Sequence, residues 1–164
     1  MDNIKYSVGK KLQFKKVIAY RKRIVQSEAN EMLNIFENYI EYNKLKKVSP
    51  FINVTHGIET KNNNVYMDIE IMVAIEELSK VQSNSEVRVI DNFTLNNALL
   101  CEIKCSPLVL GSYNSKIEQY IEQMEYCPVT PGYLISKKIS NDVLYNEMEY
   151  HLYIGLKCNE KNFL

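Results

Sequence analysis

An alternating segment in the first half of the chain constrains its fold more than any other feature. In the segment 65–75, apolar side chains occupy every second position. Successive side chains of a β-strand point to opposite faces of a sheet, so this spacing predicts a long strand with one apolar face. The other face carries Asp68 and Glu70 among its residues. The segment 148–156 repeats this pattern near the end of the chain.

The two alternating segments belong to an internal repeat. The aligned pairs, all separated by the same distance along the chain, are Met67 with Met148, Pro50 with Pro131, and the helical residues 39–41 with 120–122. A constant offset across a helix, a proline and a strand indicates that the chain is built from two copies of one unit. Each copy reads strand–helix–strand–strand.

We therefore expect a single domain over residues 1–164, with repeat one at about 12–76 and repeat two at about 87–158. The predicted fold class is α+β: two pseudo-twofold-related β-α-β-β repeats forming a largely antiparallel sheet, with two helices on one face. The expected strands are 12–25, 51–58, 65–75, 87–105, 133–138 and 146–158. The expected helices run from 28 to a point near 43–47, and from 113 to a point before Cys127. Asparagines in 91–97 predict a bulged or broken fourth strand, and those at 62–64 predict a turn.

The chain resembles the GyrI-like small-molecule-binding domain, which is also the effector-binding half of multidrug-responsive transcription regulators. The residues that carry the resemblance are 17–20 in the first strand, 68–75 in the third, Gly111-Ser112-Tyr113 before the second helix and 152–156 in the last strand. The resemblance implies a stand-alone, non-enzymatic binding module without a cofactor. Its ligand would be an apolar or amphipathic small molecule, cations included, in the groove between the two helices and the sheet.

Two features depart from the family pattern. Ala74 and Gly155 stand where the family usually has a proline near the ends of the third and last strands. Many members also place a glutamate before the last hairpin, where it faces bound cations, but residues 131–136 contain no acid. Some members of the wider group hydrolyse cyclopropane-bearing toxins with a pocket glutamate and aromatic neighbours. Hydrolysis is the least favoured alternative here, because this chain lacks that glutamate and has no tryptophan.

Aromatic residues and acids on the predicted elements are the candidate ligand-binding residues. Twelve tyrosines in a chain without tryptophan would suit planar and cationic ligands through stacking and cation–π contacts. The candidates are Tyr20, Phe36, Tyr39, Tyr113, Ile117, Tyr133, Glu147 and Tyr153. For the tyrosines, ordinary positions in the core or at its rim are the alternative. For the acids Glu70, Glu147 and Glu149, the alternation itself favours solvent exposure on the outer sheet face.

Composition limits the other classes of function. The net charge is zero, although the first 23 residues are strongly basic; we interpret this as a charged edge strand, and direct nucleic-acid binding is not expected. The uneven charge keeps a protein-interaction module open as the alternative function. The two histidines and four cysteines have no metal-ligand spacing, so we expect no metal site, and no catalytic residues are assigned. Without a signal peptide or an apolar run, a cytoplasmic protein that does not enter the membrane is expected.

Overall fold

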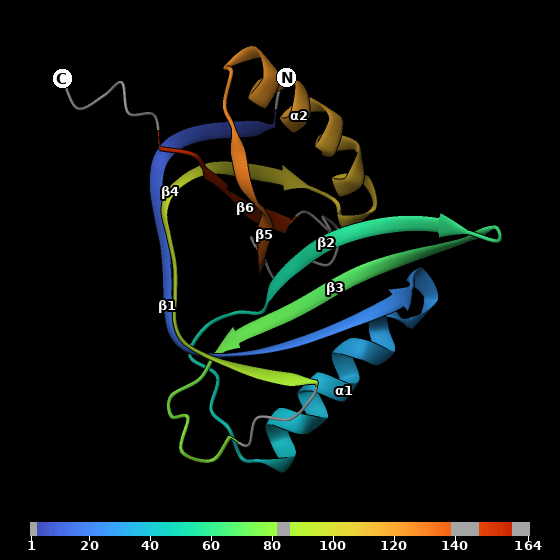
Figure 1. Ribbon diagram of the computed structural model, residues 1–164, viewed down its shortest axis with the longest axis vertical. Coiled ribbons are helices and arrows are strands. Elements are labelled where there is room, and N and C mark those ends of the chain that lie inside the picture. The colour runs from blue at the N-terminus through green and yellow to red at the C-terminus, as the bar shows by residue number, and fades with distance from the viewer. Residues whose placement is uncertain (1–2, 82–85, 139–147, 159–164) are drawn as a thin grey trace. The chain divides into compact units, whose positions relative to one another are not determined.

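The computed structural model describes residues 3–81, 86–138 and 148–158 (Figure 1). Its strands are β1 (Ile4–Val25), β2 (Ile52–Lys61), β3 (Asn64–Ala74), β4 (Val87–Cys105), β5 (Pro128–Lys138) and β6 (Met148–Leu156); its helices are α1 (Ala29–Tyr42) and α2 (Asn114–Gln123). A short 3-10 helix precedes each α-helix, at Gln26–Glu28 and Pro107–Tyr113. The predicted α+β class is confirmed. Within the described residues, neither helix has the length and apolar character needed to cross a membrane.

The chain divides into two compact units. The central unit comprises residues 13–94, and the terminal unit comprises residues 1–12 together with 95–164. Strands β1 and β4 both run through the two units: one part of each strand belongs to the central unit and the other part to the terminal unit. Each unit therefore contains one α-helix and its own antiparallel strand pairs.

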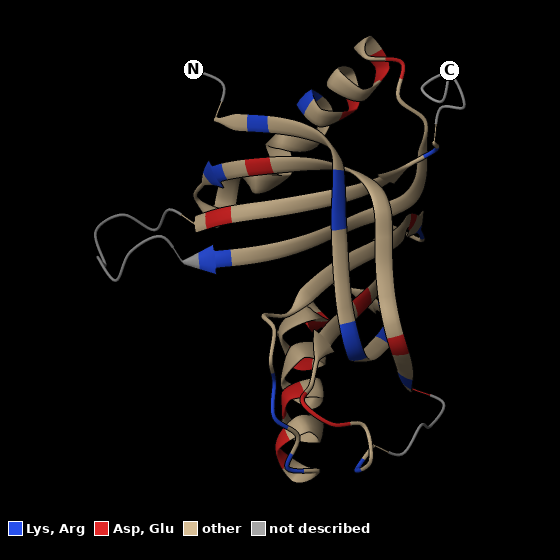
Figure 2. Ribbon diagram, turned by 90° about the vertical axis from the view of Figure 1, so that its left-hand side faces the viewer, with Lys and Arg blue, Asp and Glu red and all other residues tan. Residues whose placement is uncertain are grey.

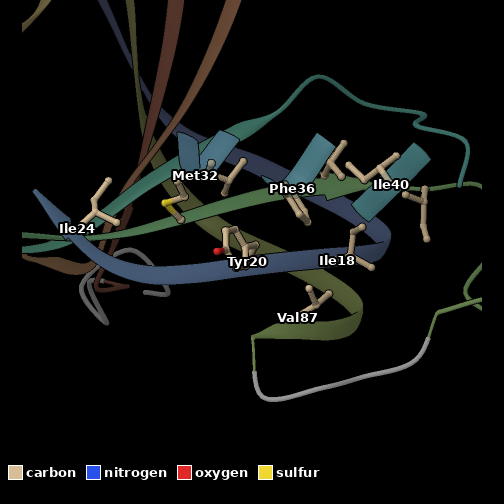
Figure 3. Packing of buried hydrophobic residues seen from close by; sticks show 10 residues of the cluster. Ile18, Tyr20, Ile24, Met32, Phe36, Ile40 and Val87 are labelled. Carbon is tan, nitrogen blue, oxygen red and sulfur yellow. The ribbon is translucent and has the colours of Figure 1, made fainter. Parts of the chain in front are cut away.

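The central unit is a sheet in the order β1-β3-β2 with α1 on one face. Met32, Phe36 and Ile40 recur every fourth residue along α1, so they lie on one side of the helix, and all three are buried. This side packs on alternate residues of the strands, as Figure 3 shows for Ile18 and Tyr20 of β1. The β2–β3 hairpin turns at Asn62 and Asn63, both with positive φ, which confirms the predicted turn.

The terminal unit has the order β4-β6-β5, with α2 packed on these strands. Its core contains alternate residues of β4, residues of β6 and Ile117 of α2; the buried members are Leu99, Cys101, Ile103, Cys105, Ile117, Tyr150, Ile154 and Leu156. The Tyr6 ring stacks on the Tyr120 ring at this core, with a centroid distance of 3.7 Å. Both units thus bury the apolar side of a helix against one face of a β-sheet.

The two repeats have the same strand register, residue by residue. In the central unit Val17 pairs with Ala74 and Arg21 with Glu70. In the terminal unit the partners are Ala98 with Gly155 and Glu102 with His151, so both members of each pair shift by the same offset that relates the two repeats. The repeat differs at a β-bulge: β2 shifts register between Thr55 and Gly57, whereas β5 shifts between Pro128 and Gly132.

Two predicted strand starts are wrong by several residues. Strand β1 begins at Ile4, not at residue 12, although its first half is rich in polar residues. Strand β4 covers the expected range 87–105, and it continues past its asparagines rather than breaking there. Strand β5 begins at Pro128 rather than at residue 133. A proline is tolerated at the first residue of a strand or at a bulge, and Pro128 and Pro131 both lie where the β5–β6 register shifts.

Gly155 is required by a close approach of Thr130 within the terminal unit. A Cβ atom at residue 155 would lie 2.7 Å from Cγ2 of Thr130, whose hydroxyl accepts a hydrogen bond from the Gly155 amide at 2.8 Å. Gly155→Ala is expected to lower the free energy of unfolding by about 1–3 kcal/mol, measured by urea denaturation, because the added methyl group overpacks this contact. Gly111→Ala is the matched control, since a Cβ there meets nothing within 4 Å. Equal stability of the two variants would contradict this role for Gly155.

Candidate functional site

The predicted ligand-binding residues of the central unit lie in its core. The side chains of Tyr20 and Phe36 are only 2% and 1% exposed, and their rings stack with centroids 5.7 Å apart. Tyr39 is half-buried and packs against the same cluster, and burial raises the pKa of its hydroxyl. The fold therefore brings these three aromatic residues together, with Tyr20 and Phe36 filling the space between α1 and the strands (Figure 3).

The predicted residues of the terminal unit form two groups. Ile117 is buried in the core and the half-buried Tyr113 packs against it. Tyr133 and Tyr153 are direct cross-strand partners on β5 and β6, so their side chains lie on the same face. Burial, and secondarily the charge of Glu102, raises the pKa of Tyr153. The remaining candidate, Glu147, lies outside the described residues.

A buried carboxylate is the most unusual feature of the central unit. Glu70 is 3% exposed, and it is the only charged residue classed as buried among those that the structure describes. The interpretation that alternation places this acid in solvent is therefore wrong. Residue 70 does lie on the face of β3 that points away from α1, as the alternation predicts. That second face is also buried, because Val17, Ala19 and Met72 on it are at most 1% exposed.

Two side chains provide hydrogen-bond partners for the Glu70 carboxylate. Nε2 of His56 lies 2.9 Å from Oε1 of Glu70, and Nη2 of Arg88 donates to Oε2 at 3.1 Å. His56 lies at the β2 bulge, between Thr55 and Gly57. A bulge inserts an extra residue and re-aims its side chain, which lets the imidazole reach an acid on the neighbouring strand. Sequence reasoning missed this cluster, because the position of a bulge within a strand cannot be read from alternation.

Glu70 marks a border on its face of the sheet. On one side are the buried apolar residues Ala19 and Met72. On the other side, Arg21 forms a two-fold hydrogen-bonded ion pair with Asp68, at 2.9 and 2.6 Å, and both side chains are more than a third exposed. The hydrogen bonds from Arg21 lower the pKa of Asp68, so this acid is ionised well below neutral pH. Arg88, whose side chain is 64% exposed, reaches Glu70 from solvent.

Cysteine chemistry does not contribute to this site. Cys101 is buried, and its burial raises the pKa of the thiol to about 12. A thiol is a nucleophile only as the thiolate, so Cys101 is unreactive at neutral pH. Cys105 is buried as well, whereas Cys127 and Cys158 are exposed. The Glu70 cluster itself brings together a carboxylate, an imidazole and a guanidinium group.

Solved structures with similar folds are known. The EcmrR chain in an EcmrR–DNA complex matches with a TM-score of 0.73 and 17% identity, over 97% of this chain and 59% of that chain. The crystal structure of the EcmrR C-terminal domain matches with a TM-score of 0.66 and 19% identity, over 94% and 99% of the two chains. A hydrolase from Listeria innocua has a TM-score of 0.51 and 9% identity, over 90% of this chain and 91% of that one.

These similarities confirm a GyrI-like fold. The chain spans about 59% of the length of the EcmrR chain that is bound to DNA, and it corresponds to nearly all of the EcmrR C-terminal domain. No protein-family model matches the sequence, and no curated protein matches it. Because the sequence identities to these structures are low, the structural similarity establishes the fold, and the function has to be argued from this chain's own residues.

Proposed function

We propose that this chain is a non-enzymatic binding domain for a small amphipathic molecule that carries a positive charge, and that Glu70 receives that charge. The observation that carries this proposal is the buried Glu70 carboxylate at the border between buried apolar side chains and solvent. Ligand sites are typically apolar with a few polar groups that fix orientation. The fold supports the proposal as well, since it is shared with the C-terminal domain of EcmrR, which occurs in a DNA complex.

The energetics of a buried charge favour a cationic ligand. A carboxylate removed from water is strongly destabilised unless cations or hydrogen-bond donors compensate it. In the free protein that compensation comes from His56 and Arg88. The Arg88 side chain is 64% exposed, so its guanidinium group can return to water at little cost when a ligand cation takes its place. Arg88 thus occupies the position that a ligand's charged group would take.

The apolar part of the ligand would have to pack against side chains that the free protein buries on the same side of the sheet as Glu70. Met72 follows Glu70 by two positions on β3, and Val54 is the direct cross-strand partner of Glu70 on β2. Ala19 on β1 is the partner of Met72. These three side chains are 1% exposed and contain no charged or hydrogen-bonding groups. A compound with an apolar body and one cationic group matches this combination better than a fully polar or a fully apolar one.

The first test compares pairs of compounds that differ only in charge. Quaternary ammonium compounds and their neutral tert-butyl isosteres are added to the wild-type protein, and the change in melting temperature is recorded. We expect stabilisation by the cationic member of at least one pair. In Glu70→Gln this stabilisation should be lost, with the affinity reduced at least about tenfold, because a charge-assisted contact is removed.

Asp68→Asn is the matched control for net charge. Asp68 lies two residues before Glu70 on the same strand face, but its side chain is 37% exposed and paired with Arg21. Its replacement should leave cation binding within about twofold of the wild type, since exposed charges contribute little. Equal losses in both variants would contradict a specific role for Glu70. Breakdown of any compound in these mixtures would contradict binding without turnover.

A further inference from the structure

The terminal unit contains a second polar cluster, formed by Glu102, Glu149 and His151. One ligand-type atom from each of these residues lies within 4.8 Å of the others. Nε2 of His151 is 2.9 Å from Oε1 of Glu149 and 3.8 Å from Oε1 of Glu102. Donor atoms bound about 2.0–2.2 Å from one metal ion are about 3–4 Å apart, so these separations are close to those of a coordinated ion.

The strand register fixes these three side chains on one face. Glu102 of β4 is the direct cross-strand partner of His151 on β6. Glu149 precedes His151 by two residues on the same strand, so its side chain points to the same side. The three donors are therefore held by paired strands rather than by a loop, which gives a more precise arrangement. All three are partly buried, with side-chain exposures of 26%, 29% and 13%.

The equivalent positions in the central unit hold a different combination of charged side chains. Arg21, Asp68 and Glu70 are the repeat equivalents of Glu102, Glu149 and His151 and have the same strand register. There, the guanidinium group of Arg21 neutralises Asp68 directly, at 2.6 Å. In the terminal unit a second carboxylate replaces that guanidinium group. Two acids and an imidazole thus converge where the other repeat has an internal cation.

A surface hollow of about 350 Å³ adjoins the cluster. It is lined by Asn3, Ile4, Lys5, Glu102, Lys104 and Glu149. Figure 2 shows acidic and basic positions next to one another on the strands of this unit. The basic groups are Lys5, whose Nζ is 3.8 Å from Oε2 of Glu102, with Lys104 and Lys137 near Glu149. Lys5 is 77% exposed and free to turn into solvent, and the hollow has room for the water ligands that complete a coordination shell.

We propose that Glu102, Glu149 and His151 bind one divalent first-row transition metal ion such as Zn²⁺. An imidazole nitrogen with two carboxylate oxygens is a donor set that suits Zn²⁺, and water would complete the coordination shell. The neighbouring lysines oppose a cation and weaken its binding. Sequence spacing did not predict this site, because the fold brings Glu102 to two residues that lie far from it in the chain. The site is independent of the Glu70 cluster and of the proposed ligand.

Isothermal titration calorimetry with ZnCl₂ tests the proposal on the full chain. The exposed thiols are removed in advance by Cys127→Ser and Cys158→Ser, because thiolates bind zinc. We expect one equivalent of Zn²⁺ to bind this protein. His151→Ala and Glu149→Gln, each made in this background, should weaken binding at least about tenfold. Asp68→Asn, the equivalent of Glu149 in the central unit, should bind Zn²⁺ as before.

A second readout reports coordination itself. Co²⁺ in the same site should give visible absorption bands that are lost in Glu149→Gln, which keeps the size of the side chain. If His151→Ala fails to fold, as judged by circular dichroism, Glu149→Gln alone decides. The proposal is overturned if the protein without exposed thiols takes up no Zn²⁺ at millimolar concentration, or if Glu149→Gln binds it as tightly as the parent protein.

Discussion

Phe36→Ala is expected to lower the free energy of unfolding by about 3–5 kcal/mol, the range for truncating a fully buried aromatic side chain. Phe36 is 1% exposed at the centre of the central unit's core. Its ring contacts the rings of Tyr20 and Phe51, with centroid distances of 5.7 and 5.9 Å. The truncation leaves a cavity between α1 and the strands that these neighbours cannot fill without leaving their own contacts.

Chemical denaturation measures this loss, and Tyr42→Ala on the same helix is the control. Tyr42 is 88% exposed, so its truncation should change stability by no more than about 0.5 kcal/mol. A loss below about 1 kcal/mol in Phe36→Ala would mean that α1 is not packed on the sheet as described. The same result would place Phe36 at a surface, where a ligand could reach it.

The double variant His56→Ala/Arg88→Ala is expected to lose about 3–5 kcal/mol of stability at neutral pH, because it leaves the Glu70 carboxylate buried without a partner. In the wild type these two residues hold both carboxylate oxygens, at 2.9 and 3.1 Å. Adding Glu70→Met to the double variant should restore most of that loss, since the uncompensated charge is removed and an unbranched apolar side chain takes its place.

Arg23→Ala serves as the control for losing a surface ion pair. Arg23 pairs with Glu59 at 2.7 Å, but both side chains are more than half exposed, so its removal should cost at most about 1 kcal/mol. Urea denaturation of the four proteins measures these differences. If the triple variant is no more stable than the double variant, the loss does not come from an unpaired Glu70, and the buried-charge interpretation is wrong.

Much of the fold could be predicted from the sequence because two regular patterns run through it. One is the spacing of apolar residues within each strand or helix, and the other is the constant offset between the two repeats. Alternation over 65–75 predicts β3, and the constant offset between the repeats predicts that β6 has the same register. The spacing of Met32, Phe36 and Ile40, each four residues after the last, predicts the buried side of α1. These patterns are local, and they are dictated by the geometry of strands and helices.

The candidate site could not be predicted in the same way. Alternation assigned Glu70 to the correct face of β3, but it contains no information on whether that face is covered. His56 reaches Glu70 from the β2 bulge, and a bulge depends on pairing with the neighbouring strand. Arg88 lies on a further strand, β4. The cluster therefore exists only through non-local pairing. The aromatic candidates Tyr20 and Phe36 were predicted from their positions on expected elements, and both lie in the core.

If Glu70 receives a ligand's positive charge and Arg88 occupies that position in its absence, replacing the two residues should change ligand affinity in opposite directions. Calorimetric affinities of one cationic compound, selected by thermal shift, test this claim in wild type, Arg88→Ala and Glu70→Gln. We expect Arg88→Ala to bind the cation more tightly, because a competing guanidinium group is gone, and Glu70→Gln to bind it at least about tenfold more weakly. Weaker binding in Arg88→Ala, or unchanged binding in Glu70→Gln, would contradict the claim.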